Sequence, residues 1–438
     1  VRCCARSIPT RCPASMVGQP GATMDPMDEI SSDSVAQHLT GLSDPRVVVS
    51  GNGGIPWALL RAVDAALPAY RLHMLNAPKG IPDREGVTYE TTFVGPGMRR
   101  HPRLSYVPSR LSRVPALFHR RLTPDVVVVH TSLPVDGKVS LGIEVNIMPG
   151  AIEAVRAAGG VVIAQANPNM PYTFGDGEYP VEAFDAIFEA EEPLVTISGN
   201  QSTDSARAQS AQAIGELVSN RIGDGATLQL GIGEIPDATL AGLLDKRDLG
   251  VWTEMVPTGV LALDERKALD TERKIVGSFA LGSQELYQWL HRNDQVRILR
   301  TETTNAPSQI AKNPGMASIN TALQVDLLDQ ANASRIAGRI HSGFGGQTDF
   351  TVGATHAPGG QAIMALRSWH PKADTSTIVA RLAEPVTSFQ HTAVITEQGV
   401  AEIEGQDERT QAKNLIDHAA HPSVRDELRE QAHVMGLA

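Results

Sequence analysis

The alternation of short apolar runs with longer helix-forming stretches is the feature that most restricts the fold of this chain. Stretches rich in Ala, Glu and Arg, such as 149–158 and 206–221, separate the apolar runs. This alternation is typical of α/β architecture, in which helices cover a largely parallel sheet. We therefore predict an α/β fold with parallel-rich sheets, whose strands include residues 46–50, 126–130, 161–165, 226–230, 297–299 and 392–396.

One strand–turn–helix pattern occurs twice. The motif Gly-x-Gly-x-Ile-Pro begins at Gly51 and again at Gly231, after a strand-like run and before a helix-like stretch each time. Proline is favoured near a helix start, where its missing N–H would have had no partner. The repeat predicts two similar α/β domains, although a chance match in a common design is the alternative. The polar stretch 198–205 is the expected linker, which places the domains at 28–205 and 206–438.

Residues 1–27 differ from the rest of the chain, and we expect them to form an unstructured extension. Met16, Met24 and Met27 are all candidate start sites downstream of Val1. The first part of the segment is rich in Arg and free of acidic residues, so a transit peptide is the alternative. It lacks the apolar stretch of about 7–15 residues that a secretory signal requires.

Charge and cysteine placement exclude several functional classes. The formal net charge of -11 disfavours nucleic-acid binding, which depends on a basic face, but local amides and a few cations could still bind an anionic ligand. No apolar run approaches the roughly 20 residues that span a bilayer. All three cysteines, Cys3, Cys4 and Cys12, precede the body of the chain. We therefore expect a cytoplasmic protein without disulfides or thiolate metal sites.

Glu254 follows a probable strand and lies in a largely apolar segment with Trp252 and Met255. A buried carboxylate needs a partner or a purpose, although most glutamates are solvated surface residues. The earlier turn at Gly231 leaves the amides of Ile232 and Gly233 available to an anion. A carboxylate that faces free backbone amides suits acyl transfer, because the carboxylate can attack an acyl carbon while the amides hold the oxyanion.

Other glycine and histidine patterns are less specific. The turn at Gly231 lacks the third glycine of a dinucleotide fingerprint. The loop at residues 342–350 has three glycines in four positions, which lets backbone approach a ligand, but no Gly-Lys-Ser/Thr follows as in a P-loop. Structural turns alone could explain both. His418 and His421 have no third ligand nearby, and no Gly-x-Ser-x-Gly elbow is present, so we predict neither a metal site nor a serine hydrolase.

Taken in order, these segments resemble the acetyl-CoA hydrolase/transferase family, which includes 4-hydroxybutyrate, butyrate, propionate and succinate CoA-transferases. The resemblance runs from about Val47 to about Glu430. It rests on residues 137–142, 166–171, 224–233, 282–287, 319–327, 345–350 and 396–401.

The resemblance implies two similar CoA-transferase-type (NagB/RpiA-like) domains with the active site between them. It implies that Glu254 is the nucleophile and that amides of Ile232, Gly345 and Gly346 form the oxyanion hole. The expected substrate-binding residues are Asn320, Glu397, Gly231, Gly233, Gly343 and Gln347.

The chain departs from the family pattern close to Glu254. Relatives usually have His where Trp252 stands, Ser-Asp-Gly where Pro257-Thr258-Gly259 stands, and Gly where Glu234 stands. A second carboxylate at Glu234 would raise the pKa of Glu254 if the two were close and unscreened.

We therefore expect a CoA-transferase that moves CoA between a short-chain acyl-CoA and a carboxylate such as acetate or 4-hydroxybutyrate. Ping-pong chemistry through a glutamyl-CoA thioester needs no metal and no permanently bound cofactor, because CoA is a substrate. One alternative is an acyl-CoA hydrolase, in which water resolves the intermediate. Another is a CoA-binding protein that has lost catalysis. The family resemblance also implies a homodimer or larger homo-oligomer.

Overall fold

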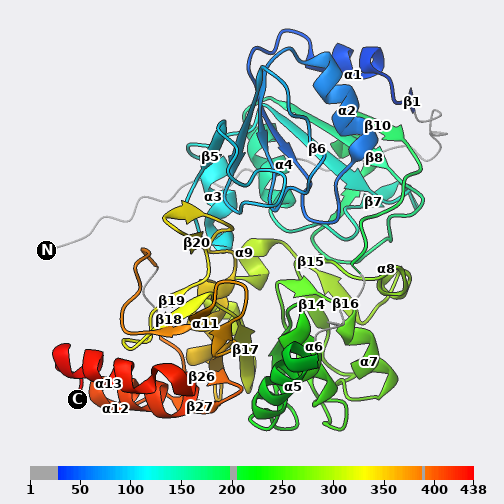
Figure 1. Cartoon of the computed structure of the whole chain (residues 1–438). Helices are drawn as coiled ribbons and strands as arrows, with labels where there is room; N and C mark the ends of the chain where they lie inside the picture. Colours follow the sequence, from blue (N-terminus) through cyan, green and yellow to red (C-terminus); the bar gives the residue numbers. More distant parts are fainter. Residues whose placement is uncertain (1–27, 198–204, 387–389) are drawn as a thin grey trace, which may run out of the picture.

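The computed structural model describes residues 28–197, 205–386 and 390–438 (Figure 1). The predicted extension, 1–27, and all of the predicted linker except Ser205 lie outside this part. The predicted alternation of strands and helices is confirmed, including helices α4 (Met148–Ala157) and α5 (Ser205–Ser219). The six predicted strands correspond to β2 (Arg46–Val49), β6 (Val126–Thr131), β8 (Val161–Ala166), β11 (Thr227–Gln229), β16 (Val296–Ile298) and β26 (Ala393–Thr396).

The first part of the chain builds an eight-stranded sheet in which every pairing is parallel. Its order is β1-β10-β8-β6-β2-β3-β4-β5. The strands not yet given are β1 (Asp28–Glu29), β3 (Tyr70–His73), β4 (Val87–Thr91), β5 (Leu104–Tyr106) and β10 (Ala186–Glu189). A separate antiparallel pair consists of β7 (Lys138–Ser140) and β9 (Glu178–Pro180).

Alternating valines explain why helices cover both faces of this sheet, because successive strand side chains point to opposite sides. Val47 and Val49 of β2 share one core with Leu59. Val48 lies in a different core, with Phe118. These cores bring helices α1 (Ser32–Leu39) and α2 (Trp57–Ala66) to one face, and α3 (Val114–Phe118) and α4 to the other.

The second part contains a six-stranded sheet, β12-β11-β17-β22-β26-β27, in which only the last pair is antiparallel. Its remaining strands are β12 (Gly250–Val251), β17 (Met316–Asn320), β22 (Gln361–Ala365) and β27 (Gly399–Glu402). Ile363 contributes to the core that contains α5. Ala362 and Met364 point to the opposite face of the sheet, where they contribute to two further cores. Its helices include α6 (Glu234–Ala241), α11 (Gln347–Thr355), α12 (Glu408–Asn414) and α13 (Arg425–Val434).

Short parallel pairs lie beside this second sheet. Strand β13 (Met255–Val256) pairs with β15 (Phe279–Ala280), and β14 (Ile275–Gly277) pairs with β16. Three short helices follow these strands: α7 (Gly259–Glu265), α8 (Gln284–Leu290) and α9 (Thr301–Thr304). Smaller elements complete the part, namely α10 (Pro307–Ile310), β18 (Gln324–Asp326), β19 (Ala331–Asn332), β20 (Arg335–Ile336), β21 (Arg339–Ile340), β23 (Trp369–His370), β24 (Thr375–Ser376) and β25 (Ile378–Val379).

Main-chain hydrogen bonds join the two parts of the chain, which meet in the middle of Figure 1. The amide of Asn146 donates to the carbonyl of Ser278 at 2.9 Å, and the amide of Ala280 donates to Ile143 at 2.8 Å. The segment that carries β15 therefore forms part of the junction. Within the described residues, no helix has the length and apolar character needed to cross a membrane.

Candidate active site

Glu254 lies in the link between β12 and β13, where its main chain is bound from two directions. Its carbonyl accepts hydrogen bonds from the amides of Ser278 (2.8 Å) and Phe279 (3.1 Å), at the junction just described. The hydroxyl of its neighbour Thr253 is buried and accepts from the amide of Leu230 at 3.0 Å. Glu254 is therefore fixed between the junction and the start of the glycine turn that follows β11.

The carboxyl group of Glu254 has two close neighbours that are far away in the sequence. The side-chain amide of Asn305, just after α9, donates to Oε2 of Glu254 at 2.6 Å. Gly346 lies so close that a Cβ at this position would collide with the same oxygen and with the amide of Asn305. Glycine is therefore required at position 346 for the carboxyl and the backbone to approach each other.

The surroundings of Glu254 raise the pKa of its carboxyl above the value it has in water. Burial raises the pKa of Glu254 to about 7, the hydrogen bond from Asn305 lowers it, and the charge of Asp349 raises it. Asp349 is itself buried and accepts hydrogen bonds from the amide and the hydroxyl of Ser112. A carboxyl with a pKa near neutrality can act as a nucleophile once it is deprotonated, so the site is poised to respond to pH around 7.

Asn305→Ala should move the rise of activity with pH to higher pH. A carboxylate nucleophile is active when deprotonated, so the native rate should rise through about pH 7. The hydrogen bond from Asn305 stabilises the charged form, and its loss should shift the midpoint upward by about one pH unit. The measurement is kcat/KM against pH. Asn313→Ala is the control, because the side-chain amide of Asn313 donates to the carbonyls of Gln309 and Ile310. An unchanged pH midpoint in Asn305→Ala would show that Asn305 does not influence the pKa of Glu254.

The predicted glycine loop at 342–346 connects Glu254 to the first part of the chain. The carbonyl of Gly345 accepts from the amide of Leu111 at 3.0 Å, and the carbonyl of Ser342 accepts from the amide of Val94 at 2.8 Å. Gly345 has a φ of 56°, a left-handed conformation that glycine adopts easily. Gly343 packs against Thr92, where a Cβ would be 2.7 Å from the carbonyl oxygen. The structure thus brings Gly346 to Glu254 and uses Gly343 and Gly345 to hold the loop.

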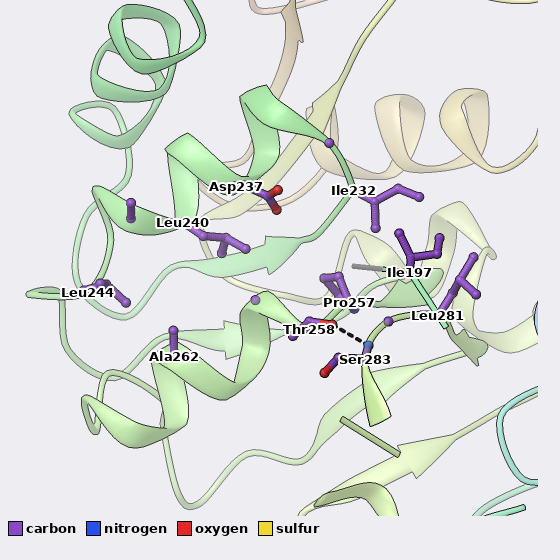
Figure 2. Close-up of a pocket in the computed structure, with 14 residues that line it drawn as sticks. Ile197, Ile232, Asp237, Leu240, Leu244, Pro257, Thr258, Ala262, Leu281 and Ser283 are labelled. Atoms are coloured by element: carbon purple, nitrogen blue, oxygen red, sulfur yellow. Dashed lines mark hydrogen bonds between the residues drawn. The ribbon is translucent and has the colours of Figure 1, made fainter. Parts of the chain in front are cut away.

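The turn at 231–233 follows β11, the strand that pairs with β12, but it makes no hydrogen bond to the carboxyl of Glu254 among the described residues. Gly233 has a φ of 115° and precedes α6 directly. The side chain of Ile232 is 47% exposed. Ile232 and Gly233 line a pocket together with Pro257, three residues after Glu254 (Figure 2). The turn therefore forms part of the wall of this pocket.

The predicted carboxylate-site residues Asn320 and Glu397 lie at the ends of β17 and β26, which flank β22 in the second sheet. The side-chain amide of Asn320, at the end of β17, donates to the hydroxyl of Ser318 at 2.8 Å. Glu397 follows β26 and accepts from the amide of Ser368 at 2.9 Å. Gln347 begins α11, beside Gly346. Asn320 and Glu397 are bonded to their own neighbours, and no hydrogen bond joins either to Glu254 in the described part of the chain.

The sequence of this chain is similar to those of known proteins. The family model for the acetyl-CoA hydrolase/transferase C-terminal domain matches residues 282–432. The 4-hydroxybutyrate coenzyme A transferase of Clostridium kluyveri is 35% identical over 393 residues, which are 85% of this chain and 89% of that protein. The chain belongs to the acetyl-CoA hydrolase/transferase family.

Solved structures of other proteins have the same fold. The 4-hydroxybutyrate CoA-transferase of Porphyromonas gingivalis is 28% identical, with a TM-score of 0.75 over 93% of this chain and 97% of that one. RipA of Yersinia pestis is 25% identical, with a TM-score of 0.83 over 93% of this chain and 98% of the other. Mixed α/β architecture with parallel-rich sheets is thus confirmed by both topology and comparison.

Glu234, where the resemblance leads us to expect glycine, forms ion pairs with nearby cations. Its carboxylate forms ion pairs with Arg207, at 2.9 Å, and with Arg367. These cations lower the pKa of Glu234 against the effect of burial. The groups that shift the pKa of Glu254 are Asn305 and Asp349, not Glu234. The concern that Glu234 would raise the pKa of Glu254 therefore does not apply, because Glu234 is not among the charges that act on Glu254.

Glu234→Gln should accordingly leave the pH dependence of activity unchanged. Losing the ion pairs to Arg207 and Arg367 should lower the free energy of unfolding by about 1 kcal/mol, since these side chains are partly exposed. Thermal unfolding and kcat/KM against pH measure the two effects. The exposed Glu404, replaced by Gln, controls for the change in net charge. A fall in the pH midpoint specific to Glu234→Gln would show that its charge does reach Glu254.

Trp252, the other departure from the family pattern, supports Asn305. Its indole N–H donates to the carbonyl of Thr304 at 2.8 Å, directly before Asn305. The ring packs against a core that includes Ile310 and Phe350. Trp252 thus helps to hold the residue that donates to Glu254.

Sequence reasoning missed a second buried carboxyl near the site. Glu144 is 1% exposed and accepts from the side-chain amide of Asn52 at 3.0 Å through both carboxyl oxygens. Burial raises the pKa of Glu144 to about 8, the hydrogen bonds from Asn52 lower it, and the charge of Glu254 raises it. An acidic residue within the apolar run 141–147 was the available signal, the same one that identified Glu254.

The two Gly-x-Gly-x-Ile-Pro turns differ in what lies at the helix start. At α2, Glu192 accepts hydrogen bonds from the amides of Trp57 (2.8 Å) and Ala58 (3.2 Å), so an internal carboxylate already occupies the anion position. At α6, Gly233 caps the helix without a side-chain hydrogen bond. Within the described residues there is no cluster of three or more metal-ligating side chains.

Proposed function

We propose that this protein is a CoA-transferase that moves CoA between a short-chain acyl-CoA and a small carboxylate of the acetate or 4-hydroxybutyrate type. Family membership makes it an enzyme of the CoA-transferase type. The observation that carries the proposal is the partly buried Glu254 carboxyl, held between the side-chain amide of Asn305 and the backbone of Gly346. A carboxylate fixed in this way is suited to attack an acyl carbon.

In the proposed reaction, a carboxylate oxygen of Glu254 attacks the thioester carbonyl, and CoA thiolate leaves to give a mixed anhydride. The thiolate then attacks the glutamyl carbonyl, which releases the free acid as its carboxylate and leaves a glutamyl-CoA thioester. An acceptor carboxylate attacks that thioester and displaces the thiolate. The thiolate finally attacks the acceptor's acyl carbon, which yields the new acyl-CoA and restores Glu254.

The amides of Ile232, Gly345 and Gly346 are the proposed oxyanion donors in each addition step. Removing one such donor typically costs about 10²–10³ in rate. The proposed substrate-binding residues are Asn320, Glu397, Gly231, Gly233, Gly343 and Gln347. The strand-end positions of Asn320 and Glu397 support this role, since ligands bind beside the carboxyl ends of parallel strands.

The proposal includes two NagB/RpiA-like domains, at 28–205 and 206–438, with the site between them. Main-chain hydrogen bonds at Asn146, Ala280 and Gly345 support a site at this junction. Acyl-CoA and a small carboxylate are the proposed substrates, with no permanently bound cofactor. A homodimer or larger homo-oligomer is proposed as the assembly.

Mixing the purified protein with acetyl-CoA and a panel of carboxylates tests the function. The panel contains 4-hydroxybutyrate, butyrate, propionate and succinate, and mass spectrometry follows the thioesters. A new acyl-CoA is the expected result. Free CoA alone would instead support the hydrolase that the family also contains. Unchanged acetyl-CoA, with CoA still bound to the protein, would support a CoA-binding protein that has lost catalysis.

A further inference from the structure

A pocket of about 510 Å³ opens between helices α6 and α7 (Figure 2). We call it the α6–α7 pocket. Its walls also include the segment 281–283 and Ile197. Its volume lies within the usual range for small-molecule sites. Hydrocarbon side chains dominate the lining: Ile197, Ile232, Leu240, Leu244, Pro257 and Leu281.

The polar groups of the α6–α7 pocket do not favour an anion. None of its fourteen lining residues is basic. Thr258 accepts a hydrogen bond from the amide of Ser283 at 2.8 Å, so that pair is already engaged. Burial, together with the charge of Glu234, raises the pKa of Asp237, the acidic residue in the wall. The pocket therefore suits an uncharged hydrocarbon group better than a phosphate or a second carboxylate.

Three residues of the α6–α7 pocket wall belong to segments that also serve the proposed reacting centre. Ile232 contributes its side chain to the pocket, and its amide is a proposed oxyanion donor. Pro257 follows Glu254 by three residues. Leu281 directly follows β15, whose Phe279 amide donates to the carbonyl of Glu254. Leu281 also lies at the junction, because a Cβ on Gly53 would be 2.9 Å from its Cδ1.

We propose that the α6–α7 pocket receives the hydrocarbon part of the acyl group, so that the enzyme extends beyond the short chains of the proposed function and prefers uncharged acyl chains of roughly six to eight carbons over acetyl. This inference rests on the proposed function, and it takes an acyl carbon held at Glu254 to direct its substituent toward Ile232 and Pro257. Burying each additional methylene should raise kcat/KM by about fourfold, the equivalent of ~0.8 kcal/mol.

The test compares kcat/KM for acetyl-, butyryl-, hexanoyl- and octanoyl-CoA, with acetate or propionate as acceptor. The native protein should show a rise with chain length. Ala262→Phe places a ring in the pocket from α7 and should reduce kcat/KM for hexanoyl- and octanoyl-CoA by at least about tenfold. The value for acetyl-CoA should stay within about twofold. Ala157→Phe, at the exposed end of α4, is the matched control and should change none of these values.

Leu244→Ala provides an independent variant if Ala262→Phe does not fold, since it enlarges the same pocket and should favour octanoyl- over hexanoyl-CoA. Two results would overturn the inference. A native preference for acetyl-CoA would show that the chain does not enter the pocket. An equal loss for every acyl-CoA in Ala262→Phe would mean that the CoA arm itself lies there. Failure of the proposed function would look different, because no thioester would be exchanged at any chain length.

Discussion

Glu254→Gln should lower turnover of acyl-CoA by at least about 10⁴-fold, the scale seen when a residue of the catalytic unit is removed. The amide is a poor nucleophile and cannot form the anhydride. The variant should still fold, because burial already favours the neutral form of Glu254, and a glutamine oxygen can accept the hydrogen bond from Asn305. Steady-state kcat and thermal unfolding measured together separate these effects.

Glu144→Gln is the matched control for Glu254→Gln, because it replaces another carboxyl near the site by the same amide. A pKa of about 8 leaves Glu144 mostly protonated at neutral pH, so a neutral amide resembles its native state. We expect a loss of less than about tenfold at pH 7. If Glu144→Gln abolished turnover while Glu254→Gln retained it, the nucleophile would have been assigned to the wrong carboxyl.

Gly346→Ala should lower kcat/KM by about 10²–10³, the scale expected when an oxyanion donor is displaced from its position. The new methyl group would collide with Oε2 of Glu254 and with the side-chain amide of Asn305. Backbone or carboxyl must then move, and both belong to the proposed site. The measurement is kcat/KM for acetyl-CoA, together with the melting temperature.

Gly223→Ala is the control for Gly346→Ala, because a Cβ at Gly223 meets no atom within 4 Å. It should leave kcat/KM and the melting temperature close to native. Full activity in Gly346→Ala would contradict the close approach of this loop to Glu254. A loss of folding in Gly346→Ala, without any effect on the turnover of the folded fraction, would assign Gly346 a structural role alone.

The sequence predicted the strands well because the signal is local. The valines of β2 and β6 alternate between two cores, and a buried parallel sheet requires such apolar runs. Glu254 was also found locally, as a charge inside an apolar segment. The identity of the site then came from the resemblance, which spans residues from both halves of the chain.

Partners that are distant in the sequence could not be predicted. Asn305 lies 51 residues after Glu254, in a polar stretch without a recognisable pattern. The arginines that screen Glu234 lie 27 and 133 residues away, so the sequence alone presents it as an unpaired carboxylate. The internal carboxylate at the first glycine turn, Glu192, is 135 residues from Trp57. Only tertiary structure brings such groups together.

The most direct test of the account is to locate the covalent intermediate. The native protein is incubated with acetyl-CoA, quenched, digested and examined by mass spectrometry for a peptide that carries CoA. The account predicts CoA attached as a thioester to the peptide containing Glu254, and no adduct in Glu254→Gln. A CoA adduct on a different residue, or turnover of acetyl-CoA to a new thioester without any adduct, would contradict it.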